Sequence, residues 1–217
     1  MYLNCHTYYS LRYGTFSELA LLQLAQENQV TQLALTDINN TSACLNFVRK
    51  APEFCIKPIL GIDFRNGVDQ CYVGIAKNNE GFLELNDFLS AHLHQGIKIP
   101  EIAPKFDHCY IIYPFEKVLR NDQKKFLEHE YIGISIADLR RLRFSRLMEL
   151  KDKLVLLQPV TFRNRRDFNA HRLLRAIDKN TLLSKLSTTE QASEEEKMFL
   201  VQNLAAVFSE HSFILEN

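Results

Sequence analysis

The sequence has no excess of either charge, no apolar run long enough for a membrane helix and no signal-peptide pattern at its start. Its 26 basic and 26 acidic side chains give a formal net charge of zero at pH 7. Domains that hold nucleic acid by bulk electrostatic attraction carry a clear excess of lysine and arginine, so this chain is not expected to grip DNA alone. A larger assembly, in which another domain holds the DNA, stays open. We expect a soluble, cytoplasmic protein with no membrane segment.

The cysteines do not suggest disulfide bonds. There are five of them, an odd number, and no two form a Cys-x-x-Cys pair. Free thiols in a reducing compartment are therefore predicted rather than a disulfide framework. With 46% apolar and 24% charged residues over 217 positions, the chain has the composition of one globular domain with a substantial core.

Short apolar runs alternate with amphipathic segments along the chain, and we find no internal repeats. Strands are predicted at 2–6, 32–36, 59–64, 70–76, 108–113, 131–135 and 153–157. Helices are predicted at about 18–25, 43–50, 82–94, 137–149, 165–177 and 194–209. A βαβα order with six or seven strands favours a parallel α/β barrel, with one hairpin that turns at 67–69.

The last thirty residues are predicted to form a helical extension of this barrel. Residues 188–196 are polar and lead into the first turn of the last predicted helix. We therefore divide the chain into a barrel over 1–187 and an extension over 188–217. The final stretch, 213–217, is apolar, and from it we expect the chain to be part of something longer.

Three predicted strands end on polar side chains. The first carries Asn4 and His6, the second leads to Asp37 and the third ends at Asp63. The carboxyl ends of parallel strands meet at one edge of a barrel, and barrel active sites lie at that edge. We therefore expect these four side chains to lie together, in the position of an active site.

Four blocks of sequence then carry a resemblance to a known family. Asn-Cys-His-Thr at 4–7, followed by Tyr-Ser-Leu-Arg-Tyr-Gly at 9–14, is similar to a block that opens His-x-His-Ser. The stretches at 34–40, 56–63 and 76–82 are similar to its later blocks, in the same order. The chain thus resembles the PHP (polymerase and histidinol phosphatase) domain at the N-terminus of the bacterial DNA polymerase III alpha subunit. The resemblance implies an α/β fold of the PHP type, a distorted (β/α)7-like barrel.

The departures from the family pattern fall on its metal ligands. In active members, these positions help to hold a cluster of divalent metals that drives phosphoester hydrolysis. Here two histidines are replaced by Asn4 and Ile38, the glutamate is shortened to Asp63, and the final Asp-x-His pair is Pro159 and Thr161. Proline and isoleucine donate no side-chain lone pair, so a two- or three-metal cluster is not expected.

The ligands that survive are His6, Asp37 and Asp63, with His108 or Cys109 as an unmatched extra. They would hold at most one residual divalent cation, which would be zinc, manganese or magnesium, and no cofactor is required.

Structural roles are the alternatives for the same residues. His6 would be a hydrogen-bonded remnant, and Asp63 would pair with Arg65 or another basic group. Asp37 would cap the following helix together with Asn39 or Asn40. His171 lies on a predicted helix and is also expected to be structural.

Three groups of basic residues are candidates for binding. Arg163, Arg165 and Arg166 follow the last predicted strand directly, so they are the residues expected to hold any anion at this edge. The other two groups are Lys124–Lys125 and the helical set Arg140, Arg141, Arg143 and Arg146. A solvated helix face is the default interpretation of the helical set, and a docking surface for DNA or a neighbouring domain is the alternative.

The resemblance implies the N-terminal PHP domain of a C-family replicative DNA polymerase, and the lost ligands imply that it no longer hydrolyses phosphoesters. Its role would be structural or docking, with nucleotidyl transfer on polymerase domains absent from this sequence. The partners so implied are those domains, a proofreading exonuclease subunit, and DNA through the parent protein. The alternative is a metal-dependent phosphoesterase or 3′–5′ exonuclease with a rearranged site.

Overall fold

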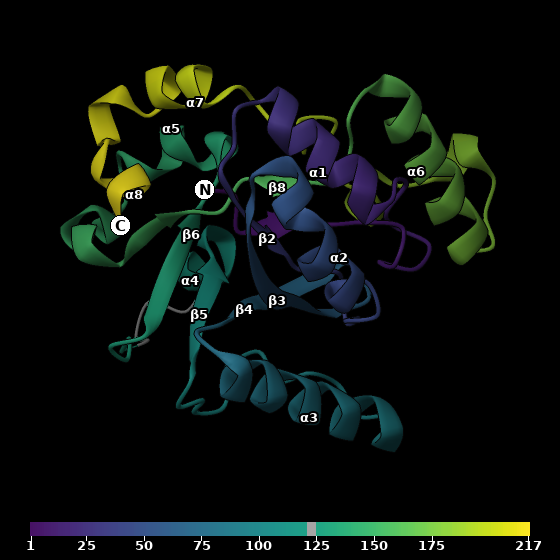
Figure 1. The fold of residues 1–217 in the computed structure, drawn as a ribbon, viewed down its shortest axis with the longest axis horizontal. Helices are drawn as coiled ribbons and strands as arrows, with labels where there is room; N and C mark the ends of the chain where they lie inside the picture. Colours follow the sequence, from purple (N-terminus) through teal and green to yellow (C-terminus); the bar gives the residue numbers. More distant parts are fainter. Residues whose placement is uncertain (121–124) are drawn as a thin grey trace.

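The computed structural model describes residues 1–120 and 125–217, and its centre is a curled six-stranded sheet (Figure 1). The strands are β2, β3, β4, β5, β6 and β7 in spatial order, spanning Gln32–Leu35, Lys57–Asn66, Asp69–Ala76, Cys109–Pro114, Glu130–Ile134 and Leu154–Leu156. A separate parallel pair joins β1 (Asn4–Cys5) to β8 (Pro159–Val160). All seven predicted strands are therefore present, although β1 is shorter than predicted and β8 is an addition.

The sheet is mixed, as the predicted hairpin implies, and one strand departs from the parallel order. β4 runs antiparallel to both of its neighbours, β3 and β5, whereas the other adjacent pairs are parallel. The hairpin predicted between β3 and β4 is confirmed. It turns at Gly67, whose φ of 68° is a conformation that glycine adopts without steric cost.

Helices connect and cover the strands. They are α1 (Glu18–Glu27), α2 (Cys44–Lys50), α3 (Asn79–Gln95), α4 (Phe115–Arg120), α5 (Leu139–Leu142), α6 (Arg165–Asp178), α7 (Val201–Val207) and α8 (Phe213–Glu216). The longest of them, α3, lies along one side of the molecule, with α6 on another side (Figure 1). α1 begins after Ser17, whose Oγ accepts a hydrogen bond from the Ala20 backbone N–H at 3.1 Å.

The helix predicted over 137–149 is wrong in extent. Only α5 is α-helical there, because serine side chains start new turns on both sides of it. Ser135 forms a capping box with Asp138, and the Ser145 hydroxyl accepts from the Leu147 backbone N–H at 3.1 Å. The segment is therefore a chain of short turns rather than one helix.

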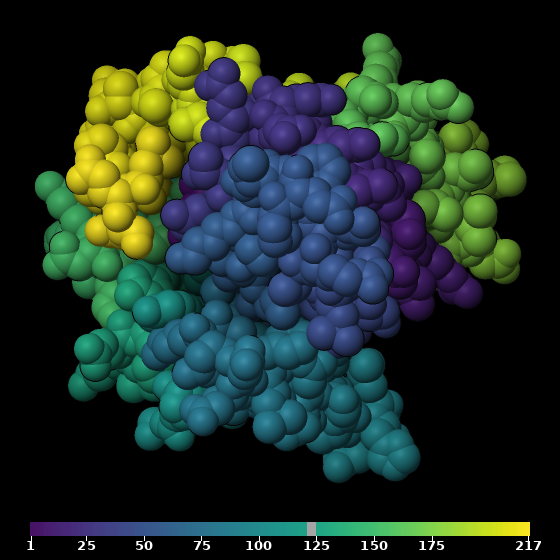
Figure 2. All heavy atoms as spheres, viewed as in Figure 1, coloured from purple at the N-terminus to yellow at the C-terminus, as the bar shows by residue number. Residues whose placement is uncertain are grey.

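The helix predicted over 194–209 begins only at Val201. Just before it, the backbone N–H groups of Thr161 and Phe162 both donate to the Glu196 carbonyl, at 2.9 and 3.1 Å. Residues 195–199 thus lie against residues 158–162 and Tyr2 instead of forming the first turn of a helix. In the space-filling view, the C-terminal residues in yellow also lie against residues near 150 in green (Figure 2).

The two faces of the curled sheet bury different sets of side chains. Ile62 and Phe64 of β3 belong to the large core beneath the helices. Because side chains alternate along a strand, Ile59, Gly61 and Asp63 share the opposite, inner face. A small apolar cluster on that inner face comprises Ala34, Val73, Ile75, Ile112, Val155 and Leu157. The inner face therefore leads from Ile59 at one end of the barrel to Asp63 at the other.

Two further sequence predictions concern the Lys124–Lys125 group and membrane segments. Lys124 lies outside the described residues, so nothing follows for the predicted Lys124–Lys125 group. Within the described part of the chain, no helix combines the length and apolar character that crossing a bilayer requires.

Candidate functional site

The polar side chains predicted to meet at one edge of the barrel do so, and all are buried. Asn4, His6, Asp37 and Asp63 are each at most 2% exposed. A parallel bridge between Ile38 and Asp63 and the β1–β8 pairing bring the strand ends together. The strand-end pattern therefore located this edge correctly, and the chemistry depends on what these side chains contact.

Asp63 is held by a buried arginine from its own strand. Arg65 Nε and Nη2 both donate to Asp63 Oδ2, at 2.9 and 2.7 Å, and His6 Nε2 lies 2.9 Å from the same oxygen. Burial pushes the pKa of Asp63 upward, but the Arg65 charge and the contacts with His6 hold it below its ordinary value. The predicted alternative, in which Asp63 pairs with Arg65, is confirmed.

His6 continues this network toward the C-terminal segment. Its Nδ1 lies 2.9 Å from Thr161 Oγ1, and the Thr161 hydroxyl itself donates to Glu196 Oε2 at 2.7 Å. His6 therefore connects Asp63 on one side to Thr161 and Glu196 on the other. The five side chains form one chain of charge-assisted hydrogen bonds, which we call the polar network: Arg65, Asp63, His6, Thr161 and Glu196.

Asp37 has a different role from the helix cap proposed as its alternative, and that alternative is wrong. Its Oδ1 accepts from the Thr7 backbone N–H and the Ser10 hydroxyl, both at 2.6 Å, and its Oδ2 accepts from the Thr7 hydroxyl at 2.7 Å. α2, by contrast, has no side-chain cap at its start. Burial raises the pKa of Asp37 against the lowering effect of these hydrogen bonds. Asp37 thus anchors the loop after β1.

That loop is folded tightly against the strand end. A Cβ added to Gly14 would lie 1.7 Å from the Thr7 carbonyl oxygen, so only glycine permits this approach. The loop places the Tyr13 ring beside the network, with the Arg65 guanidinium carbon 4.9 Å from the ring centroid. The pair has the geometry of a cation–π contact, which adds to the hold on Arg65.

His171 is structural, as predicted. Its Nδ1 lies 2.7 Å from the Tyr13 carbonyl oxygen, and its Nε2 accepts from the Ala192 backbone N–H at 2.9 Å. Burial lowers the pKa of His171 to about 4, against the raising effect of the bond to Tyr13. The neutral ring therefore ties α6 to the loop after β1 and to the C-terminal segment.

The surviving ligand candidates do not form a set of free donors for a metal ion. Both nitrogens of His6 and both oxygens of Asp37 are occupied by hydrogen bonds, and Asp63 Oδ2 accepts three. Among the side-chain oxygens and nitrogens of His6, Asp37 and Asp63, Asp63 Oδ1 is the one without a hydrogen-bond partner in the described part of the chain. No group of three or more His, Cys, Asp or Glu side chains within 1–120 and 125–217 is placed to hold a metal. The Arg65 guanidinium would also repel a cation at this point.

The other sequence candidates lie elsewhere or serve packing. Ile38 packs against the cluster of Tyr13 and Phe162, so an apolar contact fills one lost ligand position. Cys109 and His108 stand at the start of β5. There the Cys109 thiol donates to the Gly81 carbonyl at 3.3 Å, and His108 pairs with Glu80. Asn4 Oδ1 accepts from the Thr36 hydroxyl at 3.3 Å.

The arginines proposed for anion binding start α6. Arg163 is engaged by Asp167, with contacts of 2.7 and 3.0 Å, whereas Arg165 and Arg166 are exposed on the first turn. Anion binding by these residues stays a prediction. In the helical basic set, Arg141 pairs with Glu116 and Arg143 with Glu210, so two of its four charges are locally balanced.

Sequence reasoning missed Glu196 and Tyr13 as members of this site. Glu196 lies in the segment predicted to be a connector, 35 residues from Thr161, and no local pattern connects the two. Tyr13 lies within the first motif block, but nothing in its spacing indicates that it stacks on Arg65.

Comparison with known proteins identifies relatives of this chain. Residues 3–151 match the PHP domain family. The DNA polymerase III subunit alpha of Ureaplasma parvum serovar 3 is 28% identical over 162 residues, which is 75% of this chain and 16% of the relative. The chain therefore spans a small part of the length of that relative.

Proposed function

This chain belongs to the PHP domain family, and from that premise we propose that it is a PHP domain of a C-family replicative DNA polymerase in which structural support has replaced hydrolysis. The proposal extends to a cytoplasmic protein whose other polymerase domains carry out nucleotidyl transfer on DNA. Its support is the similarity to a DNA polymerase III alpha subunit together with the contacts of the polar network.

One observation carries the proposal: a fixed guanidinium sits where a metal-binding edge would need open lone pairs. Arg65 is 7% exposed and Asp63 is fully buried. Arg65 Nε and Nη2 both donate hydrogen bonds to Asp63 Oδ2. A positive charge supplied by the protein stabilises the carboxylate as a cation would, but it cannot bind or activate water as a Lewis acid does. The edge is thereby suited to holding strand ends together.

We propose further that the six-stranded sheet and the β1–β8 pair are parts of one distorted (β/α)7-like barrel. The chain around β1 is bonded to β2 and to the residue after it, through the Ala34 N–H to Tyr2 carbonyl contact at 2.9 Å and the Thr36 N–H to Cys5 carbonyl contact at 3.0 Å, and β1 itself pairs with β8. β7 and β8 are separated by only two residues, 157 and 158. Counted as one bent strand, they pair with β6 at one half and with β1 at the other, which gives seven strands in a closed ring.

The proposed partners are the remaining polymerase domains and a proofreading exonuclease subunit. Support comes from apolar side chains left in solvent around α6. Leu173, Ile177 and Leu182 are 53%, 61% and 64% exposed, and an apolar surface of this kind is common where another protein surface docks.

The test is a hydrolysis assay on single-stranded DNA and on a simple phosphoester, with manganese or zinc added. We expect no release of nucleotide or phosphate above the buffer value for the wild type, for His6→Ala or for the control His94→Ala, which changes an exposed histidine of α3. We also expect no shift in melting temperature when metal is exchanged for chelator. Metal-dependent hydrolysis that His6→Ala abolishes and His94→Ala retains would overturn the proposal in favour of the phosphoesterase.

A further inference from the structure

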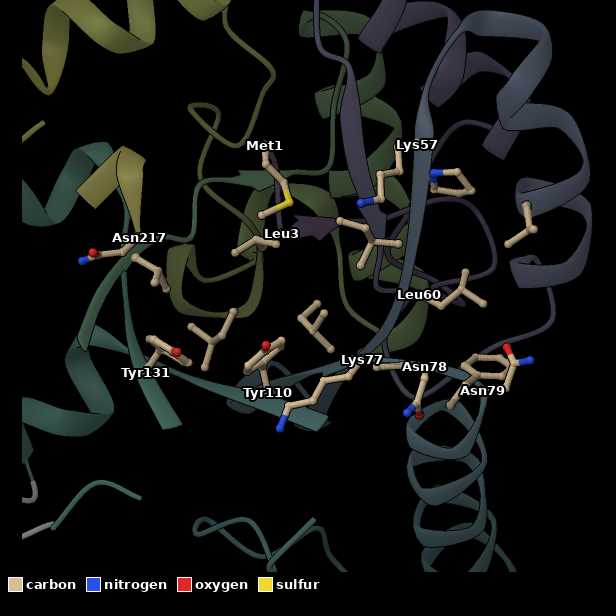
Figure 3. Close-up of a pocket in the computed structure, with 18 residues that line it drawn as sticks. Met1, Leu3, Lys57, Leu60, Lys77, Asn78, Asn79, Tyr110, Tyr131 and Asn217 are labelled. Atoms are coloured by element: carbon tan, nitrogen blue, oxygen red, sulfur yellow. The ribbon is translucent and has the colours of Figure 1, made fainter. Parts of the chain in front are cut away.

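The end of the barrel opposite to the polar network contains a cavity of about 590 Å³ (Figure 3). Its floor is apolar and belongs to the inner face of the sheet, where Leu3, Ile59, Ile75 and Val155 line it. Ile59 is four residues before Asp63 on β3, a separation of roughly 13 Å along a strand. The cavity is therefore distinct from the polar network, and its volume is in the range of sites that hold small molecules of about 300–1,000 Å³.

The charged side chains that line the cavity are all basic. Lys57, at the start of β3, extends its amine into the cavity, and Lys77 follows the end of β4 (Figure 3). No aspartate or glutamate side chain lines it, and neither lysine has an acidic partner within the described residues. In a chain with zero net charge, two unpaired amines at one cavity form a local positive site. The cavity is thus complementary to an anion.

One wall of the cavity is aromatic. Tyr110 and Tyr131 come from the adjacent strands β5 and β6, with ring centroids 5.9 Å apart in an edge-to-face arrangement. Tyr110 is 41% exposed, and Lys77 Nζ lies 4.7 Å from its ring centroid. The rim adds the amide groups of Asn78 and Asn79, which can donate and accept hydrogen bonds.

We propose that this cavity binds a nucleotide, with the base against the tyrosine wall and the phosphate beside Lys57 and Lys77. Aromatic side chains next to amines are the general means by which proteins hold an unpaired base and its phosphate. An apolar floor with amide groups at its rim suits a flat heterocycle whose edge is polar. The ligand is either a free mononucleotide or the end of a single strand, since both present the same base and phosphate.

An acidic peptide is the competing occupant, and the shape of the site favours the nucleotide. The cavity is a single hollow at the end of a barrel, whereas peptides bind along an extended groove or a sheet edge.

The test is titration calorimetry with the 217-residue chain at low and high salt. The probes are dAMP, adenosine, inorganic phosphate, a five-nucleotide single strand and an acidic peptide. Base stacking and the phosphate contact together predict that dAMP or the strand binds at least about fivefold more tightly than adenosine or phosphate alone. Higher salt should weaken that binding.

Matched variants locate the binding. Lys57→Met and Tyr110→Leu should each weaken it by about fivefold or more. Lys185→Met, in an exposed lysine of the C-terminal third, and Tyr8→Leu, in a tyrosine 46% exposed, should leave it unchanged. Tyr110→Phe keeps the ring and should retain binding, which separates loss of the platform from loss of the fold.

The outcomes decide the proposal. Equal affinity for dAMP and the strand would assign a free nucleotide, and binding of the strand alone would assign a strand end. Absence of binding by every nucleotide probe would overturn the proposal, as would binding that survives both Lys57→Met and Tyr110→Leu. Binding of the acidic peptide without any nucleotide would overturn it in favour of a docking site.

Discussion

Replacing Arg65 with methionine should destabilise the protein severely. The change leaves Asp63 buried without its cation, and removing one partner of a buried ion pair costs about 3–5 kcal/mol. The cation–π contact with Tyr13 is lost as well. For a chain of this length, that loss corresponds to a fall in Tm of roughly 6–20 °C. The measurement is urea unfolding followed by circular dichroism at pH 7.

Two variants control this prediction. Arg163→Met removes an arginine that also pairs with an aspartate, but that arginine is 40% exposed, and such pairs contribute less than about 1 kcal/mol. Asp63→Asn combined with Arg65→Met removes both charges, so it should recover much of the stability that Arg65→Met loses.

The pH dependence of the free energy of unfolding tests the same reasoning independently. In the wild type, the lowered pKa of Asp63 means that its pairing stabilises the fold above the unfolded pKa, near 4, and that this contribution is lost as pH falls through the folded pKa. In Arg65→Met, burial is opposed only by the contacts with His6, so we expect the pKa of Asp63 to rise and the folded state to retain its proton to higher pH than the unfolded state. The stability difference between wild type and variant should therefore shrink as pH falls from 7 toward 4. The reasoning would be refuted if Arg65→Met lowered the free energy of unfolding by less than about 1 kcal/mol at pH 7. It would also be refuted if the stability difference between wild type and variant grew on acidification.

Three further predictions concern the surroundings of the network. His171 binds a proton near pH 6.5 in the unfolded chain but only near pH 4 in the folded protein. The free energy of unfolding should therefore fall on acidification through that window, by up to about 1.4 kcal/mol per pH unit. His171→Gln should flatten this slope when unfolding is measured at a series of pH values. Ser10→Ala removes hydrogen bonds to Asp37 and to the Ile38 N–H, so unfolding should become easier by about 1–3 kcal/mol, whereas the exposed Ser184→Ala should change little. Tyr2→Phe removes two hydrogen bonds with the Phe199 backbone and should cost about 1–3 kcal/mol, with faster amide exchange at Phe199 as its specific signature; unchanged exchange would contradict it.

The site edge was predictable because it depends on strand ends. Period-two alternation and the parallel arrangement of β1, β2 and β3 suffice to bring His6, Asp37 and Asp63 to one edge. The Asp63–Arg65 pair was also within reach, since residues two apart on a strand share a face.

The remaining contacts depend on tertiary structure that no local pattern encodes. Asp37 had two hydrogen-bonding options, a helix start nearby in sequence and a loop 27–30 residues away, and the loop is the one observed because Thr7 and Ser10 offer three donors in a buried place. Glu196 lies in a polar run that reads as a helix start. Its backbone carbonyl instead accepts hydrogen bonds from the Thr161 and Phe162 N–H groups, and these tertiary contacts outweigh local helix propensity.

The hydrogen bonds between Tyr2 and Phe199 have a consequence for the order of folding. They join residues 197 positions apart, so they close nearly the whole chain into one loop. During synthesis, Tyr2 can bridge to β2 after a few dozen residues have been made. β1 must still wait for β8, and the Tyr2 hydroxyl must wait for Phe199. Residues 2–5 are thus made long before their last partners, and folding dominated by such distant contacts is slow. A nascent chain shorter than about 200 residues would expose an unfinished strand edge to other chains in the cell.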